Sequence, residues 1–201
     1  MNVLIVGTGA VGVAMAATLH SVGWKVSLLA RGATKDAIAA GGLRRTGLFG
    51  EAAIPAGEAA VSDDYGAFPE GSFDYILISV KTMANDAVSD ALWANRAILK
   101  PQGKLVILQN GWGNDQAYLR HFPKEQVCCA RVITGFQRLE PDVSNVTVHT
   151  APVLLGNLYG LDVAPLEPLA QAINAGGIPC QTTDDVGAAL WAKMLYNCTL
   201  N

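Results

Sequence analysis

Short apolar runs alternate with longer, mostly apolar stretches at the start of the chain. The run Val3–Val6 is continuous and rich in β-branched residues, which is typical of a strand buried on both faces of a parallel sheet. Val13–His20 is the expected first helix, which Gly23 ends, and Trp24–Leu29 is the next expected strand. These segments predict a strand–helix–strand unit of roughly thirty residues.

The same alternation continues along the rest of the chain. Asp74–Val80 and Lys104–Leu108 are expected core strands, with a helix over Asp86–Ile98 and a turn at Pro101–Gly103 between them. The other expected elements are small antiparallel strands at Leu43–Thr46 and Glu51–Ile54, strands at Val127–Ile133 and within Gln137–Leu155, and a helix over Pro165–Ala175. This order predicts an α/β fold with a doubly wound sheet whose second half is more antiparallel.

The turn after the first strand is rich in glycine. It reads Gly7-Thr8-Gly9-Ala10-Val11-Gly12, a GxGxxG spacing between a predicted strand and a predicted helix. In such a turn Gly7 allows the tight bend, Gly9 lets the backbone approach a pyrophosphate, and Gly12 lets the helix lie close to the strand. The phosphates then lie at the positive end of the helix. This context favours a Rossmann-type dinucleotide site over a glycine-rich turn without a ligand.

The residue after the second strand indicates which dinucleotide binds. An acidic residue there holds the ribose 2′-hydroxyl of NAD, whereas a cation accommodates the 2′-phosphate of NADP. Arg31 stands at this position, and Lys35 offers a second positive charge. No Asp or Glu occurs between Gly12 and Asp36. We therefore expect NADP(H) as the cofactor, the alternative being that Arg31 is a solvated loop cation.

Polar residues follow two of the other predicted strands. Ser79-Val80-Lys81 places a lysine at the end of one, and Gln109-Asn110-Gly111 places an amide at the end of the next. Ligands of open α/β sheets bind outside the carboxyl ends of the strands. Lys81 and Asn110 are therefore expected to face the crevice of the nicotinamide and ribose, the alternatives being a solvated lysine and an ordinary Asn-Gly turn.

The last segment predicts an apolar helix with one polar stripe. Asp184 or Asp185 is a natural N-cap, and Lys193, Asn197 and Asn201 follow at a spacing of four residues. Partial burial would lower the pKa of Lys193 and suit it to donate a proton near neutral pH. The alternative is an exposed lysine whose stem covers apolar surface.

Composition narrows the class of protein. The chain has 201 residues, 51% of them hydrophobic, and a net charge of −3, so a sizeable core is expected and nucleic acid is not an expected partner. No apolar stretch approaches a membrane span of about 18 residues. Met1 leads directly into the first strand without a signal peptide, so we expect a cytoplasmic protein.

The cysteines suggest no metal site. They lie in apolar segments without metal-ligand spacing, and we expect them to be buried, reduced thiols. They are Cys128, Cys129, Cys180 and Cys198.

Taken together, these features resemble the ketopantoate reductases, which reduce 2-dehydropantoate to pantoate with NADPH in pantothenate biosynthesis. The resemblance covers essentially the whole chain and is most specific in the segment Leu190–Asn201. It implies that Lys193 is the catalytic lysine, which protonates the carbonyl oxygen of the substrate as hydride arrives. It also implies that Asn110 lies near the nicotinamide and substrate. The further implied roles are substrate binding by Asn197 and Asn201, and cofactor binding by Arg31 and Lys81.

The resemblance also implies a domain organisation. Residues 1–183 would form the NADP-binding domain, and residues 184–201 would begin a helical domain that binds substrate and supports a homodimer. Family members carry roughly a hundred further helical residues, so the resemblance implies either that this chain is a fragment of a longer protein or that it is a truncated relative with impaired activity.

Two rival functions are compatible with the same residues. One is an NADP-dependent reductase of another 2-oxo or 3-hydroxy acid, because the named side chains handle a carbonyl and a hydride but do not identify the acid. The other is a non-catalytic module that senses NADP(H). Turnover of 2-dehydropantoate with NADPH discriminates among the three.

Overall fold

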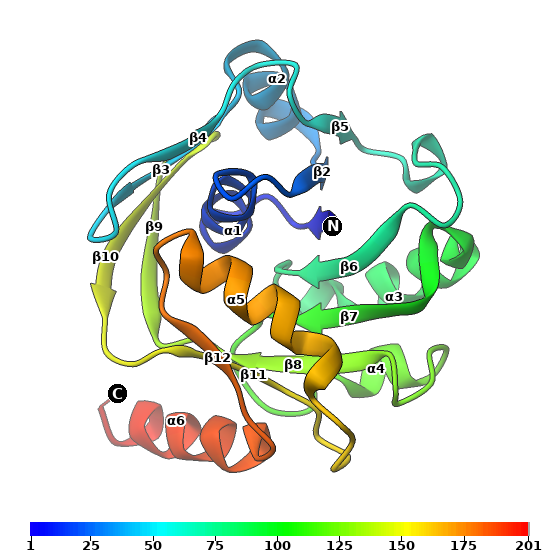
Figure 1. Cartoon of the computed structure of the whole chain (residues 1–201), viewed down its shortest axis with the longest axis vertical. Coiled ribbons are helices and arrows are strands. Elements are labelled where there is room, and N and C mark those ends of the chain that lie inside the picture. The colour runs from blue at the N-terminus through cyan, green and yellow to red at the C-terminus, as the bar shows by residue number, and fades with distance from the viewer. Residues whose placement is uncertain (201) are drawn as a thin grey trace.

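The computed structural model describes residues 1–200, with the side chain of Leu200 left out, so Asn201 lies outside the described residues. Strands form two sheets (Figure 1). The strands of the first sheet are β1 (Asn2–Val6), β2 (Lys25–Leu29), β5 (Ala60–Ser62), β6 (Phe73–Ile78), β7 (Leu99–Ile107), β8 (Val127–Arg131), β11 (Val153–Gly156) and β12 (Cys180–Thr182). Within residues 1–200, their order across the sheet is β12-β11-β8-β7-β6-β1-β2-β5.

The first sheet is parallel over most of its width. Six neighbouring strands, β5, β2, β1, β6, β7 and β8 in their order across the sheet, all run in one direction. The chain order reverses at β1, which pairs with β2 on one side and with β6 on the other. β11 is antiparallel to β8 and brings β12 with it. The carboxyl ends of β1, β2, β6, β7 and β8 therefore share one edge, where a doubly wound sheet binds its ligand.

The second sheet contains β4, β3, β10 and β9 in that order. Its strands are β3 (Leu43–Gly47), β4 (Ala52–Ile54), β9 (Thr134–Glu140) and β10 (Val143–His149). The antiparallel pair β3–β4 was expected, but it does not continue the first sheet. It joins β10 and β9 instead, because β3 and β10 pair in parallel across a long sequence separation that local patterns do not reveal.

The helix α1 (Ala10–His20) lies between the two sheets (Figure 1). Every residue from Gly12 to Leu19 is buried. A helix that is apolar all round is expected to be buried all round, and here the first sheet covers one side of α1 and the second sheet covers the other. The apolar sequence of α1 thus explains why a second layer of strands exists.

The other α-helices of the described chain are α2 (Gly32–Gly41), α3 (Asn85–Ala94), α4 (Gln116–Leu119), α5 (Glu167–Ala175) and α6 (Val186–Leu200). Short 3-10 helices occur at Tyr65–Ala67, Thr82–Ala84, Arg96–Ile98 and Ala164–Leu166. α1 and α5 pack on the face of the first sheet that carries Val3 and Ile5. α3, α4 and the start of α6 pack on the face that carries Leu4 and Val6. Both faces of the sheet are therefore covered, as the continuous apolar strands predict.

Two local expectations are corrected. Pro101–Gly103 is not a turn but part of β7, where the pairing slips from Phe73–Leu99 to Tyr75–Lys104. β7 therefore carries extra residues at an irregularity in its pairing with β6, and pairing continues on both sides of it. Cys198 is exposed, whereas Cys128, Cys129 and Cys180 are buried. Its segment is apolar, but this face of α6 is turned away from the sheet.

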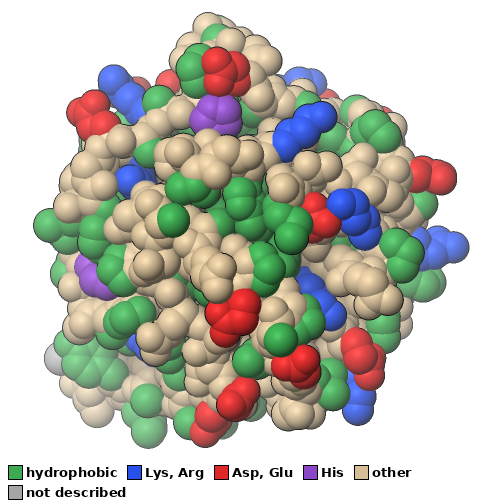
Figure 2. All heavy atoms as spheres, in the orientation of Figure 1, with side chains coloured by type: hydrophobic (Ala, Val, Ile, Leu, Met, Phe, Trp, Pro, Cys, Tyr) green, Lys and Arg blue, Asp and Glu red, His purple; other side chains and the backbone are tan. Residues whose placement is uncertain are grey.

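The surface mixes charges of both signs. In Figure 2, basic and acidic side chains are interspersed, and hydrophobic side chains gather at the lower left, where Figure 1 draws α6. Trp191, Leu195 and Tyr196 of this helix are exposed. Among the described helices, none is both long and apolar enough to cross a membrane. No cluster of three potential metal ligands occurs within residues 1–200.

Candidate active site

The glycine-rich turn has the geometry expected of a dinucleotide loop. Gly7 has φ +98°, and a Cβ atom there would lie 2.6 Å from the Val80 nitrogen. A Cβ atom at Gly12 would lie 2.0 Å from the Gly7 carbonyl oxygen, so α1 packs directly on the turn. A Cβ atom at Gly9 would meet nothing within 4 Å. Gly7 and Gly12 thus have structural roles, while Gly9 faces open space where a ligand can approach.

The positive end of α1 borders that space. Gly9 caps the helix without a side chain, and the first backbone bond runs from the Val13 nitrogen to the Gly9 carbonyl at 2.9 Å. The earlier N–H groups of a helix have no intrahelical acceptor and favour an anion. Ala10 and Val11 both line the adjoining cleft. This arrangement suits a pyrophosphate.

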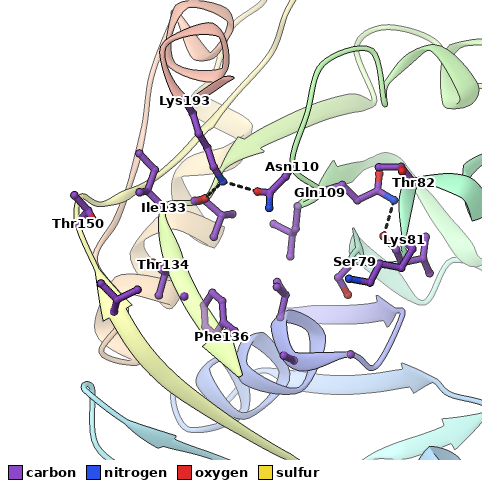
Figure 3. A pocket seen from close by; sticks show the side chains of 18 residues that line it. Ser79, Lys81, Thr82, Gln109, Asn110, Ile133, Thr134, Phe136, Thr150 and Lys193 are labelled. Atoms are coloured by element: carbon purple, nitrogen blue, oxygen red, sulfur yellow. Dashed lines mark hydrogen bonds between the residues drawn. The ribbon is translucent and has the colours of Figure 1, made fainter. Parts of the chain in front are cut away.

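Two hollows meet at the glycine-rich turn. The larger, which we call the cleft, has a volume of about 570 Å³ and extends from Gly9 to Lys193 (Figure 3). The smaller, the Arg31 groove, has a volume of about 280 Å³ and is also lined by Thr8. Gly9 and Val80 line both. The two hollows therefore adjoin, and the cations Arg31, Lys81 and Lys193 among their lining residues suit an anionic dinucleotide.

The Arg31 groove contains a cation that sequence analysis missed. Arg138 of β9 lines the groove with Arg31, and its Nη2 donates a hydrogen bond to Thr34 Oγ1. Lys35 does not line this groove and instead pairs with Asp63 at 2.7 Å. No local pattern marks Arg138, because β9 reaches the groove only through the second sheet. Arg138, rather than Lys35, supplies the second positive charge.

Lys193 and Asn110 meet at the other end of the cleft. Lys193 Nζ, carried by α6, donates hydrogen bonds to Asn110 Oδ1 and to the Val132 carbonyl oxygen (Figure 3). These three residues come from α6, from the loop after β7 and from the segment after β8, so tertiary packing assembles the site. Asp185 Oδ1 accepts a bond from the Ala188 nitrogen at 2.9 Å and caps the start of α6, as predicted.

The ammonium group of Lys193 is easily deprotonated. Burial lowers its pKa to about 8, and the positive charge of Arg131 acts in the same direction. The expectation that partial burial lowers this pKa is confirmed. A lysine with a pKa near neutrality is suited to general acid–base chemistry.

A polar network fixes the loop that carries Asn110. Gln109 Nε2 donates to the Val80 carbonyl oxygen at 2.7 Å and to Asn85 Oδ1 at 2.6 Å. Asn114 Nδ2 donates to the Asn110 carbonyl oxygen at 2.9 Å. The bond from Gln109 to Val80 joins the segment after β7 to the segment after β6. Gln109 and Asn114 therefore fix the loop in which Asn110 lines the cleft.

The remaining predicted residues line two hollows that share Lys193: Lys81 lines the cleft, and Asn197 lines a second, neighbouring hollow. Ser79 donates a hydrogen bond from its hydroxyl to the Gly7 carbonyl oxygen at 2.5 Å and so anchors the glycine-rich turn. The second hollow has a volume of about 370 Å³. We call this hollow the Arg131 cavity, after the arginine that lines it.

A family model and the curated relatives indicate one family. A family model described as "Ketopantoate reductase PanE/ApbA" matches residues 3–159. The chain is 29% identical over 202 residues to the 2-dehydropantoate 2-reductase of Aquifex aeolicus, covering 100% of this chain and 61% of that protein.

Solved structures give the same result. The crystal structure of 2-dehydropantoate 2-reductase from Geobacter metallireducens has a TM-score of 0.85 and 28% identity, covering 98% of this chain and 62% of that one. A PanE/ApbA family ketopantoate reductase from Ralstonia eutropha has a TM-score of 0.81 and 28% identity, covering 98% and 61%. The chain thus spans less than two thirds of the length of these relatives, and it belongs to the ketopantoate reductase family.

Proposed function

We propose that the protein is a 2-dehydropantoate reductase that uses NADPH. Ketopantoate reductases are oxidoreductases that use NAD(P)H. The observation that carries the proposal for this chain is the contact of Lys193 Nζ with Asn110 Oδ1 at the end of the cleft that begins at the glycine-rich turn. A dinucleotide whose phosphates lie at the glycine-rich turn can extend along the cleft and place its nicotinamide beside Lys193, so that the hydride and the proton reach the same carbonyl group.

The residues of the chain divide the work of this reaction. A bound reduced nicotinamide supplies the hydride. Lys193 then donates the proton that the carbonyl oxygen needs as it gains negative charge, and the Asn110 amide orients the ammonium group and the substrate. Gly9, the start of α1 and Arg31 bind the phosphates of the dinucleotide, with Lys81 beside the ribose. Asn197, and Asn201 beyond the described residues, bind the substrate.

The domain boundary is part of this proposal. Residues 1–183 form the NADP-binding domain, and residues 184–201 begin a helical substrate domain. The exposed side chains of Trp191, Leu195 and Tyr196 on α6 support this division, because apolar surface of this kind is normally covered by another part of the protein.

The assay that tests the function is steady-state reduction of 2-dehydropantoate by the full-length protein with NADPH, followed at the nicotinamide absorbance. Pantoate as the product supports the proposal. Reduction only of other 2-oxo acids favours a different substrate for the same site. NADPH binding without reduction of any 2-oxo or 3-oxo acid favours a sensing module.

Arg31→Ala is expected to narrow the preference for NADPH over NADH by about 1.5 to 3 kcal/mol, because hydrogen bonds to a charged group are worth that much. Titration of the reduced nicotinamide by fluorescence measures both affinities. Lys35→Ala is the matched control and should leave the preference unchanged, since Lys35 pairs with Asp63. Equal affinities of the unmodified protein for the two cofactors would refute the assignment.

Reduction and its reverse are expected to depend on pH in opposite directions. Lys193 donates a proton only in its ammonium form, so kcat/KM for ketone reduction should fall as the pH rises through the Lys193 pKa of about 8. Oxidation of the hydroxy acid needs the neutral amine and should rise over the same interval. Rates measured from pH 6 to 10 test this, and two parallel profiles would contradict it.

A further inference from the structure

Arg131 is a buried cation without a protein partner. It is the last residue of β8, and only 7% of its surface is exposed. Its Nε is a buried atom with no hydrogen-bond partner, and no residue of the described chain forms an ion pair with its guanidinium or accepts a hydrogen bond from it. An unpaired buried charge is strongly unfavourable. The guanidinium therefore favours an anionic partner from outside the described residues.

Arg45 shows what a buried structural arginine looks like in the same fold. It is 2% exposed. Its Nη1 donates to Thr18 Oγ1 at 2.6 Å and to the Gly176 carbonyl at 2.9 Å, and its Nη2 donates to the Phe49 carbonyl at 3.0 Å. These bonds tie β3 to α1 and to the end of α5. Arg131 makes no comparable bonds, so holding the fold together does not account for its presence.

The position of Arg131 connects it to the reaction site. The Arg131 cavity shares Lys193, Ile133 and Thr150 with the cleft, so the two hollows adjoin at Lys193. The residues that line the two hollows include three cations, Lys81, Arg131 and Lys193, and no Asp or Glu. The space around Lys193 therefore has a positive potential with no negative side chain to balance it, which favours an anionic ligand.

We propose that Arg131 binds the carboxylate of a 2-oxo acid whose ketone oxygen lies at Lys193 Nζ. This inference rests on the proposed function and adds a subsite to it. In a 2-oxo acid the carboxylate and the ketone are on adjacent carbons, so one molecule can reach both cations at the junction of the hollows. The planar guanidinium can donate two parallel hydrogen bonds to a carboxylate.

The rest of the cavity limits the side chain of the acid. Ile133, Ala189, Ala192 and Tyr196 present carbon surface there, and Asn197 presents an amide. The chemical class that fits is a 2-oxo monocarboxylate with a short, mainly apolar side chain. A second carboxylate would have no further cation in the Arg131 cavity besides Arg131 and Lys193.

The test uses the full-length protein and compares an acid with its ester. Arg131→Met should raise KM for 2-dehydropantoate by roughly 10- to 100-fold, the equivalent of a lost hydrogen-bonded ion pair. KM for the methyl ester of the same ketone should not change, since the ester carries no charge. Arg131→Lys keeps the charge but loses the planar guanidinium, so its KM for the acid should lie between the values of the unmodified protein and of Arg131→Met. The exposed Arg44→Met is the matched control and should behave as the unmodified protein.

Three results would overturn the subsite. They are an unchanged KM for the acid, equal losses for acid and ester, and a change confined to NADPH affinity. Arg131→Lys carries the test alone if Arg131→Met fails to fold. An unchanged KM with normal turnover rejects the subsite and leaves the proposed function intact.

Calorimetric titration of the NADPH-bound protein with oxamate, a 2-oxo carboxylate analogue that is not reduced, separates the two proposals. Oxamate binding that weakens in both Arg131 variants, in a protein that does not reduce 2-dehydropantoate, supports the subsite and rejects that substrate. Absence of oxamate binding to the unmodified protein, together with an acid KM that is insensitive to Arg131, rejects the subsite.

Discussion

Lys193→Ala is expected to lower turnover by about 10²- to 10⁴-fold, the usual contribution of a positioned general acid. The methyl group of alanine cannot replace the ammonium that contacts Asn110 and the Val132 carbonyl. NADPH affinity should remain nearly intact, because the phosphate-binding residues lie at the other end of the cleft. Steady-state kinetics on 2-dehydropantoate, with NADPH binding measured in parallel, make the comparison.

Two further variants separate chemistry from structure. Lys193→Arg keeps a positive charge, but a guanidinium has a much higher pKa than an ammonium group and is a poor proton donor near neutral pH, so the turnover of this variant should also be low. The exposed Lys124→Ala is the matched control and should be fully active. A Lys193→Ala protein that loses only cofactor affinity would remove Lys193 from the catalytic role.

Gly9→Val is expected to weaken NADPH binding by about 10²- to 10⁴-fold, which corresponds to the loss of about two hydrogen bonds to charged phosphate groups. A side chain at Gly9 projects into the open space shared by the cleft and the Arg31 groove. The protein itself should remain stable, because Gly9 has φ −79°, which valine adopts readily, and no atom lies within 4 Å of the added Cβ.

Gly12→Ala is the contrasting variant at the same turn. Its added Cβ would lie 2.0 Å from the Gly7 carbonyl oxygen, so it should lower the free energy of unfolding. Fluorescence titration with NADPH and thermal melting distinguish the two effects. Normal NADPH binding by Gly9→Val would mean that the phosphates do not cross this turn.

The sequence predicts the parts of the fold that depend on continuous burial. β1, β2, β6 and α1 follow from apolar runs, because an element buried on all sides needs no periodicity to be recognised. α2 was not predicted, since Ile38 is its only buried residue within the described chain and leaves no apolar stripe to recognise. The division of the strands into two sheets also escaped prediction, because it depends on the distant pairing of β3 with β10.

Site residues with a local sequence signal were predicted, and those brought to the site only by tertiary packing were not. Lys81 and Asn110 were found because both follow predicted strands, and Lys193 was found because it interrupts an apolar helix. Arg131 ends β8 on the same edge of the sheet, but the sequence predicts a strand that continues to Ile133, so the rule that identified Lys81 does not point to it. Arg138 had no such signal. The roles assigned to all these residues, and a homodimer formed through the C-terminal region, stay predictions.

The enclosure of α1 by two sheets links ligand binding to the stability of the whole fold. Neither sheet can separate from α1 without exposing an apolar helix surface to water, so the two sheets and the helix form one cooperative unfolding unit. The N-terminus of this same helix is the proposed anchor of the dinucleotide phosphates. Cofactor binding at one turn would therefore shift the folding equilibrium of both sheets together, by mass action and without any change of shape.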